Sequence, residues 1–168
     1  LGRRGRIARW TRVSVASVRQ REGGVALIRI MLVAGEASGD LHGASLASAM
    51  SRLCGEIEMF GVGGDRMQAS GVELVHHMKT LAVVGITEVV RHLGDVRAAL
   101  NALTVAAETR EVDAVVLIDY PDFNLWLARR LRKRVPHVPI IYYISPQVWA
   151  WRAGRVKKIA RLVDQMLV

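Results

Sequence analysis

Cysteine, long apolar runs and metal-ligand patterns are scarce in this sequence, and each scarcity narrows the class of protein. The 168 residues contain one cysteine, Cys54, so no disulfide can form within the chain, which fits a reducing compartment. No apolar run approaches the roughly 18 residues that a membrane-spanning helix requires. His76 and His77 are adjacent and would point in opposite directions on a strand, which is no metal-ligand spacing. We therefore expect no metal site.

Acidic residues are almost absent from the first 29 positions, where the positive charge is concentrated. This segment holds eight arginines and one glutamate and carries +7, whereas the rest of the chain carries only +2. The body shows no helix-turn-helix, zinc-finger or RNP-type pattern, so the net charge of +9 does not indicate nucleic-acid binding. We interpret residues 1–26 as a basic, disordered arm and residues 27–168 as one folded domain.

Short apolar runs alternate with longer amphipathic stretches from residue 27 onward, which is typical of βα units around a parallel sheet. The continuous apolar run 114–118 is of the kind buried on both faces of a sheet. Apolar spacings of three and four predict a long helix over 86–107, with Gly94 as a candidate interruption. Further strands are expected at 27–34, 57–62, 72–75, 139–144 and 165–168, and helices at 41–53 and 125–134. The fold class is therefore α/β, a Rossmann-like parallel sheet flanked by helices.

The glycine motifs of several enzyme classes are missing. After the first strand, Gly35 and Gly39 are separated by three residues, which is not the G-x-G-x-x-G of a dinucleotide enzyme. There is no P-loop and no G-x-S-x-G nucleophile elbow, which weighs against P-loop enzymes and serine hydrolases. Ligands of parallel sheets collect at the carboxyl ends of the strands, so we expect the polar segments that follow the strands to form one crevice.

Two carboxylates follow the buried run 114–118. Asp119 and Asp122 flank a tyrosine and a proline at the mouth of the strand, where a carboxylate can be held near a ligand and partly desolvated, as a general base requires. The alternative is structural: Asp122 caps the next helix and Asp119 ends the strand by bonding local amides. Spacing alone does not separate these interpretations.

Five segments, taken in order, resemble the motifs of one enzyme family. They are 33–40 (VAGEASGD), 61–67 (GVGGDRM), 84–89 (VGITEV), 118–124 (IDYPDFN) and 145–152 (SPQVWAWR). Together they resemble the lipid A disaccharide synthases over about residues 28–168. The resemblance implies the N-terminal, acceptor-side domain of a two-domain GT-B-type glycosyltransferase, with a C-terminal UDP-binding domain that this sequence lacks.

The resemblance also implies the reaction and its residues. A 2,3-diacylglucosamine passes from its UDP carrier, UDP-2,3-diacylglucosamine, to the 6-hydroxyl of 2,3-diacylglucosamine 1-phosphate. The β-1,6 linkage forms with inversion and release of UDP, without metal or cofactor. Asp119 matches the family's proposed base, and the predicted substrate contacts are Glu36, Ser38, Gly39, Asp40, Asp122, Asn124, Ser145 and Gln147. Amides at a helix start near Ser38 suit an anionic group, whereas the polar side chains also have turn or cap interpretations.

The acylated substrates imply a cytoplasmic enzyme attached peripherally to the inner membrane. Candidate contacts with lipid are the apolar residues Val89, Val90, Leu93 and Val96, or the basic cluster Arg129, Arg130, Arg132, Lys133 and Arg134. Core packing is the alternative for the apolar residues, and a solvated helix end is the alternative for the basic cluster. Two other functions stay open for the whole chain: a non-catalytic module that binds the lipid acceptor, and a UDP-sugar epimerase-like domain.

Overall fold

The computed structural model describes residues 27–81, 89–144 and 159–167, with the side chains of 89–93 excepted. Six strands are present in these ranges: β1 (Ile28–Ala34), β2 (Ile57–Gly63), β3 (Glu73–His77), β4 (Ala114–Ile118), β5 (Ile140–Tyr143) and β6 (Gln165–Leu167). The labelled helices are α1 (Ala37–Leu53), α2 (Asp65–Ala69), α3 (Val89–Thr109) and α4 (Pro121–Arg134), with a 3₁₀ turn, η2, at Met78–Thr80; residues 159–162 are also helical. The strand at 114–118 coincides with its prediction from the sequence.

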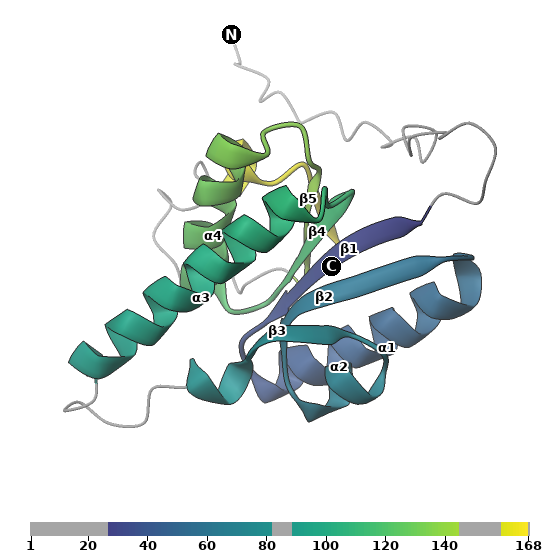
Figure 1. Ribbon diagram of the computed structural model, residues 1–168, viewed down its shortest axis with the longest axis horizontal. Coiled ribbons are helices and arrows are strands. Elements are labelled where there is room, and N and C mark those ends of the chain that lie inside the picture. Colours follow the sequence, from purple (N-terminus) through teal and green to yellow (C-terminus); the bar gives the residue numbers. More distant parts are fainter. Residues whose placement is uncertain (1–26, 82–88, 145–158, 168) are drawn as a thin grey trace, which may run out of the picture.

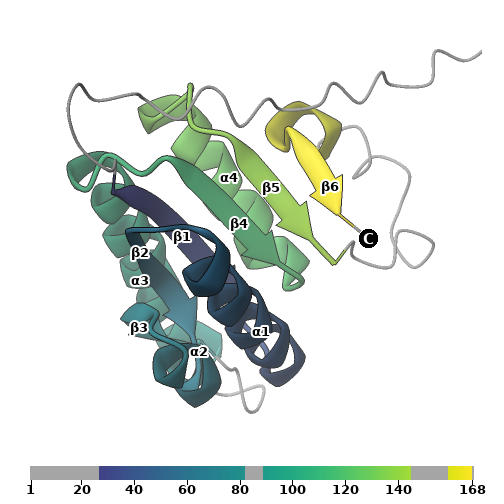
Figure 2. The same cartoon turned by 90° about the vertical axis from the view of Figure 1, so that its right-hand side faces the viewer.

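The strands form one sheet in the order β3-β2-β1-β4-β5-β6, and every pairing is parallel (Figure 1). This is the strand order of the doubly wound Rossmann fold. Helices α1 and α2 cover one face of the sheet, and α3 and α4 lie side by side on the other (Figure 2). The predicted fold class, a Rossmann-like parallel sheet flanked by helices, is confirmed.

Two apolar cores result from covering both faces. Along β1, Met31 and Val33 pack with α3 and α4, while Ile30 and Leu32 pack with α1. A strand buried on both faces needs apolar side chains at successive positions, which explains the continuous apolar run at 114–118. No helix in the described ranges is long and apolar enough to cross a membrane.

Two helices begin four residues earlier than predicted. Helix α1 begins at Ala37 rather than Leu41, and α4 begins at Pro121 rather than Leu125. Neither N-cap residue, Glu36 or Tyr120, makes a side-chain capping hydrogen bond, so the usual start signal is missing from the sequence. Proline at the first position of α4 is favourable because it lacks the N–H that a helix start leaves unsatisfied.

Three smaller differences concern the first half of the domain and the long helix. The segment after β2, expected as a loop, contains the short helix α2. Strand β3 ends at His77 rather than at Val75. Helix α3 runs through Gly94 without a break, and a Cβ atom there would meet nothing within 4 Å. Packing of the rest of α3 against the sheet outweighs the weak helix propensity of one glycine.

Candidate active site

The strand order reverses direction between β1 and β4, and the candidate site lies there. Ala34 and Ile118 are paired at the carboxyl ends of these two strands. From this point α1 leaves toward one face of the sheet and α4 toward the other (Figure 2). In doubly wound proteins ligands bind outside the strand ends at such a divergence, and we call this position the crevice. The segments that follow β1 and β4 therefore come together, as the sequence predicted.

The turn between β4 and α4 has an unusual backbone. Asp119 and Tyr120 both lie in the left-handed region, with φ of 46° and 45°. Non-glycine residues rarely adopt this conformation, and each costs on the order of 1–3 kcal/mol. Two successive examples at the mouth of a buried strand mark a segment that the surrounding structure holds in place.

Hydrogen bonds hold both peptide groups of Asp119. Its N–H donates to the Tyr143 carbonyl at 3.3 Å. Its carbonyl oxygen accepts from the Tyr142 hydroxyl and from Asn124 Nδ2, each at 2.6 Å. No described residue forms a hydrogen bond or an ion pair with the Asp119 carboxylate. The backbone of Asp119 is therefore fixed, and its side chain is half-buried at the end of β4.

Three of the predicted acidic residues converge around two tyrosines. Burial raises the pKa of Tyr120, and the charges of Glu36 and Asp122 raise it further. Burial likewise raises the pKa of Tyr142; the Asn124 side chain partly opposes this by hydrogen bonding, and the charges of Asp119 and Asp122 raise the pKa further. These interactions place the carboxylates from the β1–α1 and β4–α4 segments in one electronegative neighbourhood.

The start of α1 supplies amide donors beside these acids. The first intrahelical hydrogen bond runs from Asp40 N–H to the Glu36 carbonyl at 2.9 Å, so the preceding amides have no acceptor within the helix. Ser38 is exposed there, and Gly39 is buried against Ala34, where a Cβ atom would lie at 3.2 Å from its methyl group. The amides and the positive end of the helix dipole suit an anionic group or a sugar hydroxyl.

Tyr120 closes one side of this neighbourhood. A Cβ atom at Gly35 would overlap the Tyr120 ring, so the ring lies directly on the backbone of the β1–α1 segment. The Tyr120 hydroxyl donates to the Leu81 carbonyl at 3.4 Å, and its ring lies 5.7 Å from that of Phe123. Glycine at position 35 is required by this close approach.

The structure directs the carboxylate of Asp40 toward another helix. Asp40 is 4% exposed and accepts hydrogen bonds from the backbone N–H groups of Gly64, Arg66 and Met67, at 2.7, 3.2 and 3.0 Å. These are the amides at the start of α2, whose own N-cap, Gly64, has no side chain to satisfy them. The contacts explain Asp40 structurally and disfavour its predicted contact with substrate.

Asn124 is likewise occupied by the backbone. Its side chain is fully buried, and Nδ2 donates to the carbonyls of Ile118 and Asp119.

Asp122 lies exposed in the first turn of α4, where its charge is favourable to the helix dipole, and the N-cap is Tyr120. The capping interpretation of Asp122 is therefore wrong.

Several predicted residues belong to segments outside the part of the chain that the structure describes. Ser145 and Gln147 lie outside the described residues, as do residues 1–26 of the basic arm and the side chains of Val89, Val90 and Leu93. Val96, the remaining apolar candidate for lipid contact, is partly buried and packs against the core beneath α3. Core packing is therefore the observed environment of Val96.

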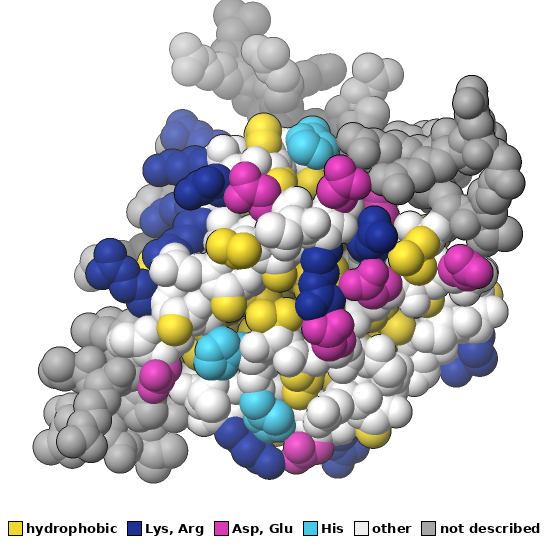
Figure 3. Space-filling model, in the orientation of Figure 1, with side chains coloured by type: hydrophobic (Ala, Val, Ile, Leu, Met, Phe, Trp, Pro, Cys, Tyr) yellow, Lys and Arg dark blue, Asp and Glu magenta, His cyan; other side chains and the backbone are white. Residues whose placement is uncertain are grey.

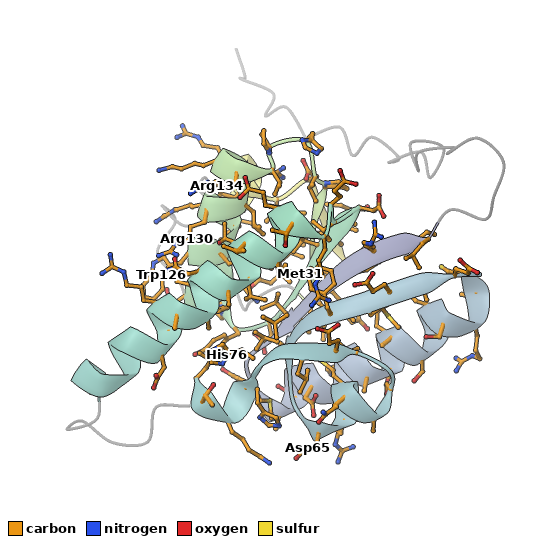
Figure 4. All side chains as sticks on the ribbon, in the orientation of Figure 1. Met31, Asp65, His76, Trp126, Arg130 and Arg134 are labelled. Atoms are coloured by element: carbon orange, nitrogen blue, oxygen red, sulfur yellow. The ribbon has the colours of Figure 1, made fainter. Side chains whose placement is uncertain are left out.

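The basic cluster lies on α4, and three of its members, Arg129, Lys133 and Arg134, are exposed. Trp126, Arg130 and Arg134 project from the helix away from the sheet (Figure 4), and dark blue side chains gather over it in the space-filling view (Figure 3). Trp126 is 46% exposed. Arg132 pairs with Asp164 at 2.5 Å and Arg134 with Glu108 at 3.7 Å, so part of the cluster is neutralised within the fold.

A second polar network lies at the amino ends of β1, β2 and β3, at the end of the sheet opposite the crevice. Arg110 pairs with Glu58 and Glu73 at 3.1 and 2.5 Å and stacks over Phe60, while Arg29 pairs with Glu58 at 3.1 Å. A shallow depression of about 370 Å³ lies over these groups. Their charges compensate one another, which indicates a structural network rather than a ligand site. Within the described residues no group of acidic, cysteine and histidine side chains could hold a metal ion.

Sequence reasoning missed three residues of the site: Gly35, Tyr120 and Tyr142. The sequence signal for Tyr142 was its alternation with Ile140 on a strand expected to be buried. Its role depends on the register Leu117↔Tyr142, which brings β5 beside the end of β4 and is not readable from the sequence. Tyr120 stood inside a recognised motif but was interpreted only as a spacer between two aspartates.

Comparison with known proteins gives a consistent picture. A family model described as lipid-A-disaccharide synthetase matches residues 30–168. Lipid-A-disaccharide synthase of Geobacter sulfurreducens is 53% identical over 140 residues. The enzymes so named from Myxococcus xanthus and Coxiella burnetii are 48% and 45% identical over 139 residues. Each match covers 83% of this chain, which spans only 36% of the length of these relatives. The chain belongs to the lipid-A-disaccharide synthetase family.

Proposed function

We propose that this chain is the acceptor-side domain of a lipid A disaccharide synthase and that Asp119 is its general base. The observation that carries the proposal is the construction of the β4–α4 turn. Its backbone is fixed by hydrogen bonds to both peptide groups of Asp119, and its carboxylate bonds to no described residue. A base must be held in position and still be able to reach the hydroxyl proton that it removes.

The proposed step is an inverting displacement. The 6-hydroxyl of 2,3-diacylglucosamine 1-phosphate attacks the anomeric carbon of UDP-2,3-diacylglucosamine, the bond from that carbon to the phosphate oxygen breaks, and UDP leaves. The hydroxyl proton passes to the Asp119 carboxylate as the new carbon–oxygen bond forms. Proton removal in the transition state by a positioned base is worth about 10²- to 10⁴-fold in rate.

The start of α1 is the proposed site for polar groups of the acceptor. The amides before Asp40 and the exposed Ser38 hydroxyl lie beside the crevice, where a phosphate or sugar hydroxyl can accept or donate hydrogen bonds. Glu36 and Asp122 contribute negative charge to the same neighbourhood, so we propose that they bind sugar hydroxyls and not phosphate. Ser145 and Gln147 stay predictions for the segment that follows β5.

The donor is proposed to bind mainly in a second domain. The relatives are almost three times as long as the matched segment, which leaves ample chain for a second domain. We propose that the complete enzyme is a GT-B-type protein in which that domain holds UDP across the crevice. This chain alone is then expected to be inactive in transfer.

Peripheral attachment to the cytoplasmic face of the inner membrane follows from the acylated substrates. The outer side of α4 supports it with exposed Trp126 and with Arg129 and Lys133, which are exposed and form no ion pair among the described residues. Basic residues attract anionic lipid, and tryptophan favours the headgroup region. The amino-terminal half of α3, which holds Val89, Val90 and Leu93, stays the other candidate.

The proposal is tested by sugar transfer from UDP-2,3-diacylglucosamine to 2,3-diacylglucosamine 1-phosphate. The chain extended with its native downstream sequence should form the β-1,6 disaccharide and UDP, and the Asp119→Asn variant should not. A non-catalytic acceptor-binding module would bind the acceptor without transfer in either form. An epimerase would convert the UDP-sugar without needing an acceptor, so incubation with the donor alone distinguishes an epimerase from a transferase.

A further inference from the structure

The carbonyl oxygen of Asp119 is held by two buried side chains from different elements. Tyr142 of β5 donates its hydroxyl and Asn124 of α4 donates Nδ2, each at 2.6 Å. Both residues are completely buried. Asn124 Nδ2 also reaches the carbonyl of Ile118 at 3.3 Å, so it bridges the last residue of β4 and the first residue of the turn. We call Tyr142 and Asn124 the carbonyl clamp.

Asn124 is oriented so that its amide nitrogen makes the hydrogen bonds to the backbone. Its Oδ1 atom is buried and has no hydrogen-bond partner among the described residues. Buried carboxamides normally satisfy both ends, and an unsatisfied acceptor is unfavourable. The fold tolerates this defect at the residue that restrains a strained turn, and such costs cluster where position matters for function.

The Tyr142 hydroxyl is a polar group in an apolar core, so its presence there requires an explanation. Tyr142 lies in the apolar core between the sheet and the α3–α4 layer, where phenylalanine would fill the same space without a polar atom. The hydroxyl has one acceptor, the Asp119 carbonyl. Its contribution to the fold is therefore the restraint that it places on this carbonyl.

Fixing both peptide groups of Asp119 fixes the point and the direction from which its side chain leaves the backbone. The N–H of Asp119 is bonded to Tyr143 and its carbonyl to the clamp, so neither peptide plane can rotate without breaking a hydrogen bond. The Cα–Cβ bond of Asp119 is thereby held relative to both β5 and α4. A misplacement of about 1 Å at a reacting group can cost 10²-fold in rate.

We propose that Tyr142 and Asn124 are positioning residues that keep the Asp119 carboxylate aligned for proton removal. The effect on proton removal rests on the proposed function of Asp119, whereas the restraint of the β4–α4 turn by the clamp does not. The clamp touches no substrate and acts only through the backbone of Asp119. It predicts a loss of turnover without a loss of substrate affinity.

The structural part is tested by hydrogen–deuterium exchange in the chain extended with its native downstream sequence. The Tyr142→Phe variant should exchange the amides of residues 119, 120 and 122–124 about tenfold faster than the wild type, with β2 (Ile57–Gly63) as an internal reference that does not change. The matched control is Tyr143→Phe, since no described residue bonds the Tyr143 hydroxyl. Unchanged exchange at 119–124 in the Tyr142→Phe variant would overturn the clamp, whether or not the protein is a transferase.

The functional part is tested by steady-state transfer. Tyr142→Phe should lower kcat by about 10- to 100-fold with KM for both substrates within about twofold, and Asn124→Leu should do the same. In an Asp119→Glu background, whose carboxylate is already displaced by a methylene group, Tyr142→Phe should cost less than about twofold. An equal loss in both backgrounds, or a raised KM with unchanged kcat, would overturn the positioning role. A wild type without transfer activity would instead contradict the proposed function, leaving the exchange result intact.

Discussion

The ring of Tyr120 lies in the space that a side chain at Gly35 would occupy, and this contact joins the two segments that form the crevice. Gly35 follows β1 and Tyr120 follows β4, so the contact spans the point where the strand order reverses. It also connects the strained β4–α4 turn to the start of α1. A change on either side of the contact is therefore expected to disturb both halves of the site.

The first prediction concerns Gly35. Gly35→Ala should destabilise the protein by about 1–3 kcal/mol, because the new methyl group overlaps the Tyr120 ring and must displace it. The free energy of unfolding from urea denaturation measures the effect. Gly94→Ala is the matched control: it lies in open space within α3 and should raise stability by about 0.5–1 kcal/mol. Equal effects of the two substitutions would contradict the contact.

The second prediction concerns Asp40. Asp40→Ala should cost about 1–3 kcal/mol, because three backbone amides at the start of α2 lose their acceptor in a buried position. Ser45→Ala, an exposed position on the same helix, should stay within about 0.5 kcal/mol of the wild type. If Asp40 instead contacts substrate alone, its replacement will weaken substrate binding and leave the unfolding midpoint unchanged.

The third prediction concerns the acid limb of stability. The hydrogen bond from Arg110 lowers the pKa of Glu73 from its ordinary value of 4.5. A lowered folded-state pKa contributes stability above the unfolded value, and this stability is lost as pH falls through the folded value. Glu73→Gln should therefore flatten the loss of stability below pH 4.5, measured as the urea midpoint against pH. The same substitution in an Arg110→Met background should leave the slope unchanged.

The fourth prediction concerns the stability of the fold at alkaline pH. Burial raises the pKa of Tyr142 above its ordinary value of 10.0, so the folded state holds the phenol proton more tightly than the unfolded state. Stability from this difference is present below pH 10.0 and is lost as pH rises above it. Tyr142→Phe should be less stable than the wild type near neutrality and should show a shallower decline above pH 10.0. Parallel curves would show that the hydroxyl is not buried.

The sequence predicted the class of fold and the end of the sheet where the polar segments after β1 and β4 meet, because both depend on local patterns. Buried strands such as 114–118 leave continuous apolar runs, and polar residues follow them wherever loops cluster. The starts of α1 and α4 were placed too late because Glu36 and Tyr120 cap these helices without side-chain hydrogen bonds. The sequence therefore contains no capping signal from which these two helix starts could be predicted.

The parts of the site that the sequence did not reveal depend on contacts between distant residues. Asp40 satisfies amides 24 to 27 residues away, and Tyr142 reaches a carbonyl 23 residues earlier. Both contacts require the register between strands and the packing of helices, which single residues do not encode. The prediction of Asp119 as the base came from a resemblance to a family motif, and the hydrogen bonds that fix its backbone are visible only in the structure.

The most direct test of the account compares the wild type with Asp119→Asn in the chain extended with its native downstream sequence. Two quantities are measured: kcat for transfer to 2,3-diacylglucosamine 1-phosphate, and the Kd of that acceptor. A general base held by its backbone predicts that kcat falls by about 10²- to 10⁴-fold while the Kd stays within about twofold, because the amide side chain keeps the shape but takes no proton. A variant that turns over within a few fold of the wild type would contradict the assignment of Asp119.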